Sequence, residues 1–222
     1  MEEKLQPVAG DTLYFLGDYI DRGPQSKEVI DYIRALQVSD IYVVALMGNH
    51  EESMIQSILE ARSQKKKWLG LFKKGLYTRN AWYNFGGEET MKSFGVDDPT
   101  LIPDEYFEWL NGLHNYAIEE KYLLSHAGFN FNTENIFDDT DSMRWIRDFT
   151  VDLQKTGGKK VIHGHVPVHL EVIRESISNP RFNFIDLDNG CVFRNRPGMG
   201  NLIGFELNTA ELIIQKNIDS YS

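Results

Sequence analysis

Four short apolar segments of this chain are each followed at once by glycine or by side chains that bind metals or carry protons. The segments end at residues 16, 47, 124 and 162, and their β-branched and aromatic residues favour strands over helices. The sequences that follow them are Gly17–Gly23 (GDYIDRG), Gly48–Glu51 (GNHE), Ser125–Gly128 (SHAG) and His163–His165 (HGH). Open α/β sheets carry their functional sites at the carboxyl ends of strands. The pattern therefore predicts a layered α/β sheet with one polar site at one edge.

The remaining patterns predict the other elements of a single domain spanning residues 1–222. The expected strands cover residues 12–16, 41–47, 122–124, 161–162 and 182–187, with a closing hairpin at 202–207 and 211–215. Helical spacing of apolar residues predicts a helix capped by Ser26 and another over residues 53–62. Residues from about 63 to 115 show no clear strand, and we expect a mostly helical insertion there. Its tryptophans (68, 82 and 109) are expected in the core, and its lysines (65–67, 73–74) on a solvated face.

The charge balance narrows the classes of partner. The chain has 23 Lys and Arg residues against 33 Asp and Glu residues, which gives a formal charge of −10. Proteins that bind nucleic acid or anionic membranes usually present a basic face, so we expect neither partner. A single cysteine, Cys191, fits a reducing cytoplasm, and no segment approaches the roughly 20 apolar residues of a membrane span. The expected location is therefore cytoplasmic, and the sequence leaves the oligomeric state open.

The residue types at the strand ends point to a hard or borderline metal ion. Asp, Asn and His offer oxygen and imidazole nitrogen, which suits Mn²⁺, Fe²⁺ or Zn²⁺ better than copper or an iron–sulfur cluster. Two such ions held about 3.5–4 Å apart are a common apparatus for hydrolysing phosphoesters. Arg22 adds a planar guanidinium that fits phosphate oxygens. Any one of these motifs alone is an ordinary turn or a structural histidine, but all of them in order at strand ends favour a functional site.

Together the motifs resemble the metallophosphoesterases, and most closely the phosphoprotein phosphatase branch with its bacterial and phage-type serine/threonine phosphatases. That branch has the ordered pattern GDxHG, GDxxDRG, GNHE, a strand ending in His, and GH. Gly17–Gly23 and Gly48–Glu51 match the second and third motifs in full, and Ser125–Gly128 and Gly164–His165 match the last two. Leu187–Cys191 (LDNGC) resembles a strand end of the bacterial members. The resemblance implies a calcineurin-like β-sandwich flanked by helices and carrying the helical insertion.

The resemblance also implies roles for individual residues. Two divalent ions are expected, most often Mn²⁺, with Fe or Zn as alternatives. Four side chains would bind them, with Asp18 bridging both ions and the others completing the second site: Asp18, Asn49, His126 and His165. His50 would give a proton to the leaving oxygen, oriented by Asp21, while Arg22 and Arg147 would bind the phosphate. His163 and His169 match no ligand position, so we expect supporting or structural roles for them.

One motif of the pattern is absent. GDxHG, which supplies an Asp and a His to the first metal, has no counterpart, because the seventeen residues before Asp18 contain no histidine. Residues 1–6 resemble the end of the helix that normally follows this motif. The first strand and most of the first helix are therefore expected to be missing. Either the sequence begins too late in its gene, or a shortened protein keeps only the second metal site, and this form is then expected to be weakly active or inactive.

Three functions follow from these observations. The first is a phosphoprotein phosphatase that dephosphorylates phosphoserine or phosphothreonine, on proteins or small phosphoesters, by direct attack of a metal-bound hydroxide. The second is a symmetrical bis(5'-nucleosyl)-tetraphosphatase, which would need aromatic side chains of the insertion facing the site to stack on the bases. The third is a non-catalytic remnant that binds but does not turn over. The core motifs alone do not separate the first two.

Overall fold

The computed structural model describes residues 2–67 and 79–219 of the chain. Its first part alternates helix and strand: α1 (Glu2–Leu5), β1 (Thr12–Phe15), α2 (Ser26–Gln37), β2 (Tyr42–Ala45) and α3 (Asn49–Lys67). Strands β1 and β2 pair in parallel, with Thr12 opposite Tyr42 and Phe15 opposite Ala45. Both loops that follow these strands therefore leave the sheet at the same edge.

The described part of the expected insertion is helical. It contains α4 (Arg79–Asn84), α5 (Gly87–Phe94), a 3₁₀ turn η1 (Pro99–Leu101) and α6 (Asp104–Asn111). Trp82 is 1% exposed, as expected of a core residue, and Trp109 packs against the same core. The expectations for Trp68 and for the lysines at 65–67 and 73–74 concern side chains outside the described part.

The second half of the chain forms a four-stranded sheet in the order β3-β4-β5-β6 and a separate hairpin. Its elements are β3 (Tyr116–Ile118), β4 (Tyr122–Ser125), α7 (Thr140–Trp145), β5 (Lys160–His163), α8 (Leu170–Ser178), β6 (Phe184–Asp186), β7 (Asn201–Phe205) and β8 (Leu212–Lys216). Strand β3 is antiparallel to β4, whereas β4, β5 and β6 are parallel. The ends of β4 and β5 therefore bring their polar residues to one edge.

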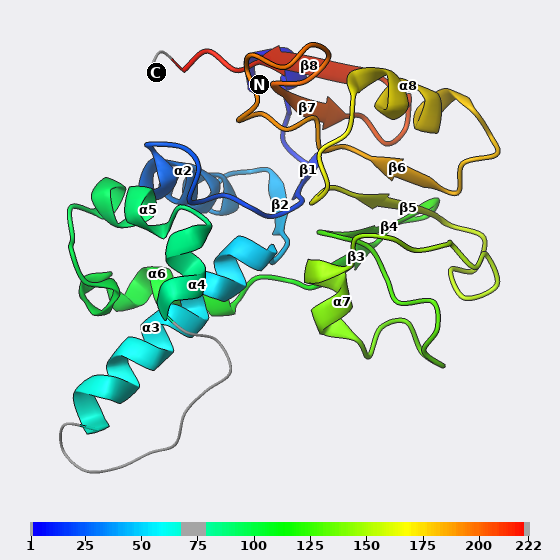
Figure 1. The fold of residues 1–222 in the computed structure, drawn as a ribbon. Helices are drawn as coiled ribbons and strands as arrows, with labels where there is room; N and C mark the ends of the chain where they lie inside the picture. The colour runs from blue at the N-terminus through cyan, green and yellow to red at the C-terminus, as the bar shows by residue number, and fades with distance from the viewer. Residues whose placement is uncertain (1, 68–78, 220–222) are drawn as a thin grey trace.

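The sheet formed by β1 and β2 packs face to face against the four-stranded sheet. A buried cluster contains Leu46, after β2, together with Leu124, Ile162 and Ile185 from β4, β5 and β6. Tyr14 and Val44, from β1 and β2, pack against this cluster. Figure 1 shows helices α2–α6 gathered beyond β1 and β2, on the side away from the four-stranded sheet. This arrangement agrees with the expected α/β sandwich with helices on its flank.

Several expectations about individual elements need correction. Ser26 does not cap its helix: the N-cap is Gln25, and the Ser26 hydroxyl instead accepts a hydrogen bond from the Asp21 amide. The helix expected over residues 53–62 spans Asn49–Lys67, so the last three residues of the GNHE motif form its first turn rather than a preceding loop. Strand β3 was not expected, because it is only three residues long and its Ile118 side chain is 52% exposed.

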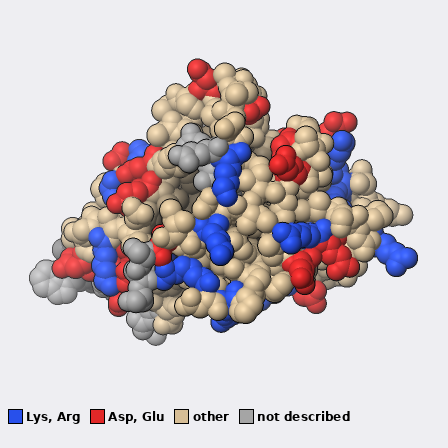
Figure 2. Space-filling model, turned by 90° about the horizontal axis from the view of Figure 1, so that it is seen from above, with Lys and Arg blue, Asp and Glu red and all other residues tan. Residues whose placement is uncertain are grey.

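Two expectations about partners, those on nucleic acid and on membranes, can be compared with the described surface and helices. On the face seen from above, basic and acidic side chains are intermingled rather than sorted into one basic field (Figure 2). Among the described helices, none combines the length and apolar character that crossing a membrane requires.

Candidate metal and catalytic site

The loops after β1 and β2 are fastened together by one buried carboxylate. Glu51 accepts hydrogen bonds from the amides of Asp18 (2.8 Å), Tyr19 (2.7 Å) and Gly48 (3.0 Å). Asp18 has a left-handed backbone with φ of 60°, which turns its side chain away from this network and towards the strand ends. Gly48 lies so close to the Asp18 carboxylate that any side chain there would collide with it. The glycine is therefore required by close approach.

The four side chains expected to bind metal converge in space. Asn49 Oδ1 lies 3.1 Å from His126 Nε2 and 2.9 Å from His165 Nδ1. His126 Nε2 is also 3.2 Å from His165 Nδ1 and 3.4 Å from Asp18 Oδ1. Each comes from the end of a different strand, since Asp18, Asn49, His126 and His165 follow β1, β2, β4 and β5. The parallel pairing within each sheet is what brings them together.

The chemistry of these atoms suits a cation. His126 Nδ1 donates to the Leu16 carbonyl oxygen at 2.7 Å, so in the neutral imidazole Nε2 presents a lone pair to the site. Burial, reinforced by the charge of His126, lowers the pKa of His165 to about 4, which keeps this imidazole neutral and free to bind a metal. Burial opposes ionisation of Asp18, but the charges of His126 and His50 lower its pKa overall. One carboxylate, one amide oxygen and two imidazoles thus face a common point.

The residues present fit one divalent ion. Within residues 2–67 and 79–219, Asp18, His126 and His165 make up the one group of three acidic, histidine or cysteine side chains close enough to share an ion. The expected second ion would need an Asp and a His that the described residues do not provide at this place. Asp188 is a further buried acid close enough to respond to the site: burial first, and then the Asp18 charge, raise its pKa.

Beside the candidate metal ligands lies a histidine–aspartate pair. His50 Nδ1 is 2.7 Å from Asp21 Oδ2, and its Nε2 lies 3.0 Å from an Arg22 guanidinium nitrogen and 3.8 Å from Asp18 Oδ2. Although burial opposes it, the hydrogen bond to Asp21 and the charge of Asp18 raise the pKa of His50. The three residues expected to act on the substrate, His50, Asp21 and Arg22, are therefore adjacent to the ligands.

Two aromatic rings border this cluster. The Phe85 ring, from the insertion, lies 5.3 Å from the His50 ring and 6.0 Å from the Trp145 ring. Trp145 in turn lies 6.5 Å from the His165 ring, and its indole donates to Glu52. Arg147 follows two residues later with an exposed side chain, and its charge contributes to the lowered pKa of His165. It therefore lies on the rim of the site rather than within it.

Three residues around the site were missed by the sequence reasoning. They are Glu51, which fastens the loops, and Trp82 and Thr90, which both donate to Asp21 Oδ1. The Glu at the end of GNHE was a signal for the first. No local pattern pointed to the other two, because they lie 61 and 69 residues from Asp21 in the chain.

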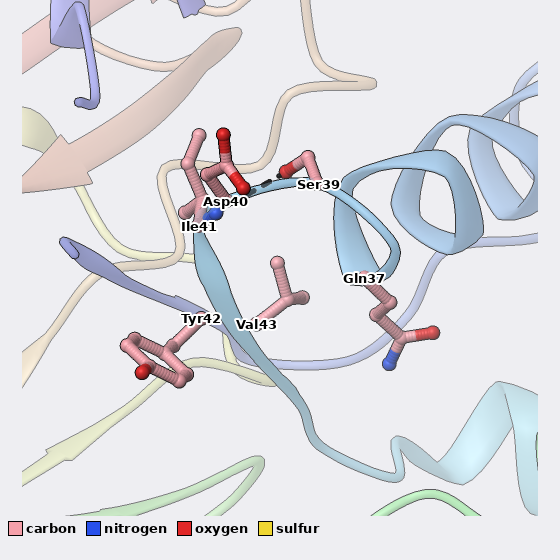
Figure 3. A pocket seen from close by; sticks show the side chains of 6 residues that line it. All are labelled: Gln37, Ser39, Asp40, Ile41, Tyr42 and Val43. Carbon is pink, nitrogen blue, oxygen red and sulfur yellow. Dashed lines mark hydrogen bonds between the residues drawn. The ribbon is translucent and has the colours of Figure 1, made fainter. Parts of the chain in front are cut away.

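A separate hollow of about 560 Å³ lies at the other end of β2. It is lined by Gln37, Ser39, Asp40, Ile41, Tyr42 and Val43, whose side chains are drawn in Figure 3. Ser39 folds this turn locally by accepting a hydrogen bond from the Ile41 amide at 3.3 Å. None of the candidate ligands or catalytic residues lines it, because these follow the carboxyl ends of the strands.

Comparison with known proteins places this site in a family. An asymmetrical bis(5'-nucleosyl)-tetraphosphatase, PrpE of Anoxybacillus flavithermus, is 27% identical over 207 residues, which cover 83% of this chain and 72% of that protein. A symmetrical bis(5'-nucleosyl)-tetraphosphatase of Vibrio vulnificus is 27% identical over 118 residues, covering 53% of this chain but only 34% of that protein. The crystal structure of a putative diadenosine tetraphosphatase shares the fold with a TM-score of 0.58, at 15% identity, over 99% of this chain and 86% of that one. Since the calcineurin-like phosphoesterase model matches residues 2–194, the chain belongs to the calcineurin-like phosphoesterase family.

Proposed function

We propose that this protein is a metal-dependent hydrolase of dinucleoside polyphosphates, with bis(5'-nucleosyl) tetraphosphates as its substrates. The observation that carries the reaction class is the convergence of four metal-binding side chains next to the His50–Asp21 pair. The substrate class rests on the relatives, which are named for bis(5'-nucleosyl) tetraphosphates. The phosphoserine and phosphothreonine activity expected from the phosphatase motifs has no such support, so the second function considered above is preferred.

The proposed roles follow from the contacts. Asp18, Asn49, His126 and His165 would hold a divalent ion, with Mn²⁺ the first choice. Such an ion neutralises charge on phosphate oxygens and makes water a stronger nucleophile at neutral pH. The remaining roles, phosphate binding and proton donation, are assigned to side chains of this protein.

His50 is proposed as the proton donor to the leaving oxygen. Asp21 binds its Nδ1–H, which fixes the tautomer and directs Nε2 towards the metal ligands. Arg22 lies against the same Nε2 at 3.0 Å, where its guanidinium can turn to clamp a phosphate oxygen and leave Nε2 for the leaving group. Arg147, on the rim, is proposed to bind a more distant phosphate of the polyphosphate chain.

Phe85 and Trp145 add a reason to prefer a nucleotide substrate. Both rings border the histidines of the site, and one comes from the insertion, as base stacking would require. A phosphoserine side chain offers no flat ring for these residues to contact.

The test is product analysis of diadenosine tetraphosphate incubated with the purified protein and Mn²⁺. Two ADP molecules per substrate indicate symmetrical cleavage, and ATP plus AMP indicates asymmetrical cleavage. Inorganic tetraphosphate and a phosphoserine peptide serve as comparison substrates without nucleosides, and His50→Gln is expected to retain Mn²⁺ binding but to lose about 10²–10⁴-fold in rate. Hydrolysis of the phosphopeptide in preference to the dinucleotide would refute the substrate assignment. Mn²⁺ binding without hydrolysis of any substrate would support the non-catalytic alternative.

A further inference from the structure

The aspartate of the His50–Asp21 pair is enclosed by the helical insertion. Asp21 and Thr90 are 0% exposed and Trp82 is 1% exposed, so the carboxylate is closed off from bulk solvent. Of its two oxygens, Oδ2 binds His50 Nδ1 at 2.7 Å. The other, Oδ1, accepts from the Trp82 indole at 2.9 Å and from the Thr90 hydroxyl at 2.7 Å. The two oxygens are thereby made different, one facing the catalytic histidine and one facing the insertion.

The same helices also hold the Asp21 backbone. Its amide donates to Thr90 Oγ1 at 2.9 Å and to Ser26 Oγ at 3.2 Å. A Cβ at Gly86 would lie 2.5 Å from the Asp21 carbonyl oxygen, so the turn between α4 and α5 fits only glycine there. Asp21 itself has φ of 84°, a left-handed conformation that needs such surrounding contacts to persist.

We propose that Trp82 and Thr90 are positioning residues for proton donation by His50. Their two hydrogen bonds saturate Oδ1 and prevent the carboxylate from rotating, so that Oδ2 stays aligned with His50 Nδ1 and Nε2 stays directed at the leaving oxygen. The inference deepens the proposed function and rests on its assignment of His50 as the acid. It gives the insertion a part in catalysis that lies apart from any contact with substrate.

A purely structural role for these residues predicts a different result. Loss of core packing would lower the amount of folded protein and would reduce the rate on every substrate by the same factor. Loss of positioning acts only on the proton transfer, and it therefore harms substrates with poor leaving groups more than substrates with good ones.

The first test measures kcat for aryl phosphates with p-nitrophenol and phenol as leaving groups, in the protein loaded with Mn²⁺. Thr90→Val keeps the shape of the side chain but removes the hydroxyl that donates to Asp21 Oδ1 and accepts from the Asp21 amide, and Trp82→Phe replaces the indole donor by a smaller ring. We expect kcat to fall about 10–100-fold for phenyl phosphate and much less for p-nitrophenyl phosphate, with KM little changed. Thr90→Ser keeps the hydroxyl and is expected to restore the wild-type pattern.

Trp109→Phe is the matched control. Trp109 packs against the same core as Trp82, and its indole donates to Gln37 at 2.8 Å rather than to Asp21. This variant is expected to keep the wild-type ratio between the two substrates. Equal losses on both aryl phosphates in Thr90→Val and Trp82→Phe would overturn the positioning role.

A second readout does not depend on turnover. In protein with ¹⁵N-labelled histidine, the His50 Nδ1–H held by Asp21 should give a strongly downfield proton resonance, assigned by its loss in His50→Gln. We expect the resonance in the wild type, Thr90→Ser and Trp109→Phe, and its shift or loss in Thr90→Val and Trp82→Phe. An unchanged resonance in the last two variants would refute the inference. If the wild type hydrolyses aryl phosphates but not diadenosine tetraphosphate, the proposed substrate is refuted and the positioning role is not.

Discussion

His163 offers a quantitative test of how tightly the strand before His165, a candidate metal ligand, is enclosed. Its side chain is 7% exposed, its ring lies 5.1 Å from Phe149 and 5.6 Å from Phe184, and its Nδ1 donates to the Gly164 carbonyl at 3.0 Å. Burial lowers the pKa of His163 from 6.5 to about 4, with a small further contribution from His126. The folded protein therefore holds this imidazole neutral.

The sign and size of the effect follow from linkage. Because the unfolded chain takes up the proton at higher pH than the folded protein, His163 costs no stability above pH 6.5 and a growing amount as the pH falls towards 4. A shift of this size corresponds to about 3 kcal/mol in all, of which about 2 kcal/mol is lost between pH 7 and pH 5. His163→Gln removes the titration while keeping a polar side chain of similar size.

The assay is urea unfolding followed by tryptophan fluorescence at pH 7 and pH 5, with a chelator present. The free energy of unfolding should fall by about 2 kcal/mol more in the wild type than in His163→Gln. His169→Gln, at an exposed position before α8, controls for removing a histidine from the surface. If His163→Gln loses as much stability as the wild type between the two pH values, the folded protein binds this proton freely and the enclosure argument is refuted.

Three further predictions concern the site and its support. Asp18→Asn should abolish measurable Mn²⁺ binding in calorimetry while leaving the circular dichroism spectrum unchanged, because it removes the charged donor of the ligand cluster. Glu51→Gln should lower the free energy of unfolding by about 3 kcal/mol in urea, because an amide group replaces an oxygen that accepts from two backbone amides. Ile162→Ala, at the interface between the two sheets, should cost about 2–5 kcal/mol in the same assay, and a loss below 1 kcal/mol would contradict the packing of this core.

The strands and the site residues that follow them were the most predictable part of the molecule. β1, β2, β4 and β5 were all located, because a short apolar run that stops abruptly at glycine or at polar residues is a local signal. Parallel pairing brings the ends of β1 and β2 together and likewise those of β4 and β5, and the packing of the two sheets on each other brings the two pairs together. The choice of Asp18, Asn49, His126 and His165 among the residues of these loops came from the family resemblance rather than from the strand pattern.

What the sequence could not predict depends on contacts between distant segments. Ser26 looks like a helix cap, but its hydroxyl accepts from the Asp21 amide, because the loop after β1 folds back over the helix start. Trp82 is a core residue, as expected, but its indole nitrogen also donates a hydrogen bond to Asp21. Burial follows from composition and spacing, whereas the partner of a buried polar atom follows only from the packed structure.

The two acidic residues at the centre of the site illustrate how backbone geometry assigns different tasks to the same chemical group. Both oxygens of Glu51 accept from backbone amides, one from Tyr19 and the other from Asp18 and Gly48. Its oxygens are therefore occupied in joining two loops. The Asp18 amide takes part in that junction, while its left-handed φ directs the carboxylate to His126. Since the Asp18 carboxylate faces His126 while the Glu51 carboxylate is held by backbone amides, exchanging the roles of the two acids would require refolding both loops, and a variant that moves the carboxylate to another position is not expected to recover metal binding.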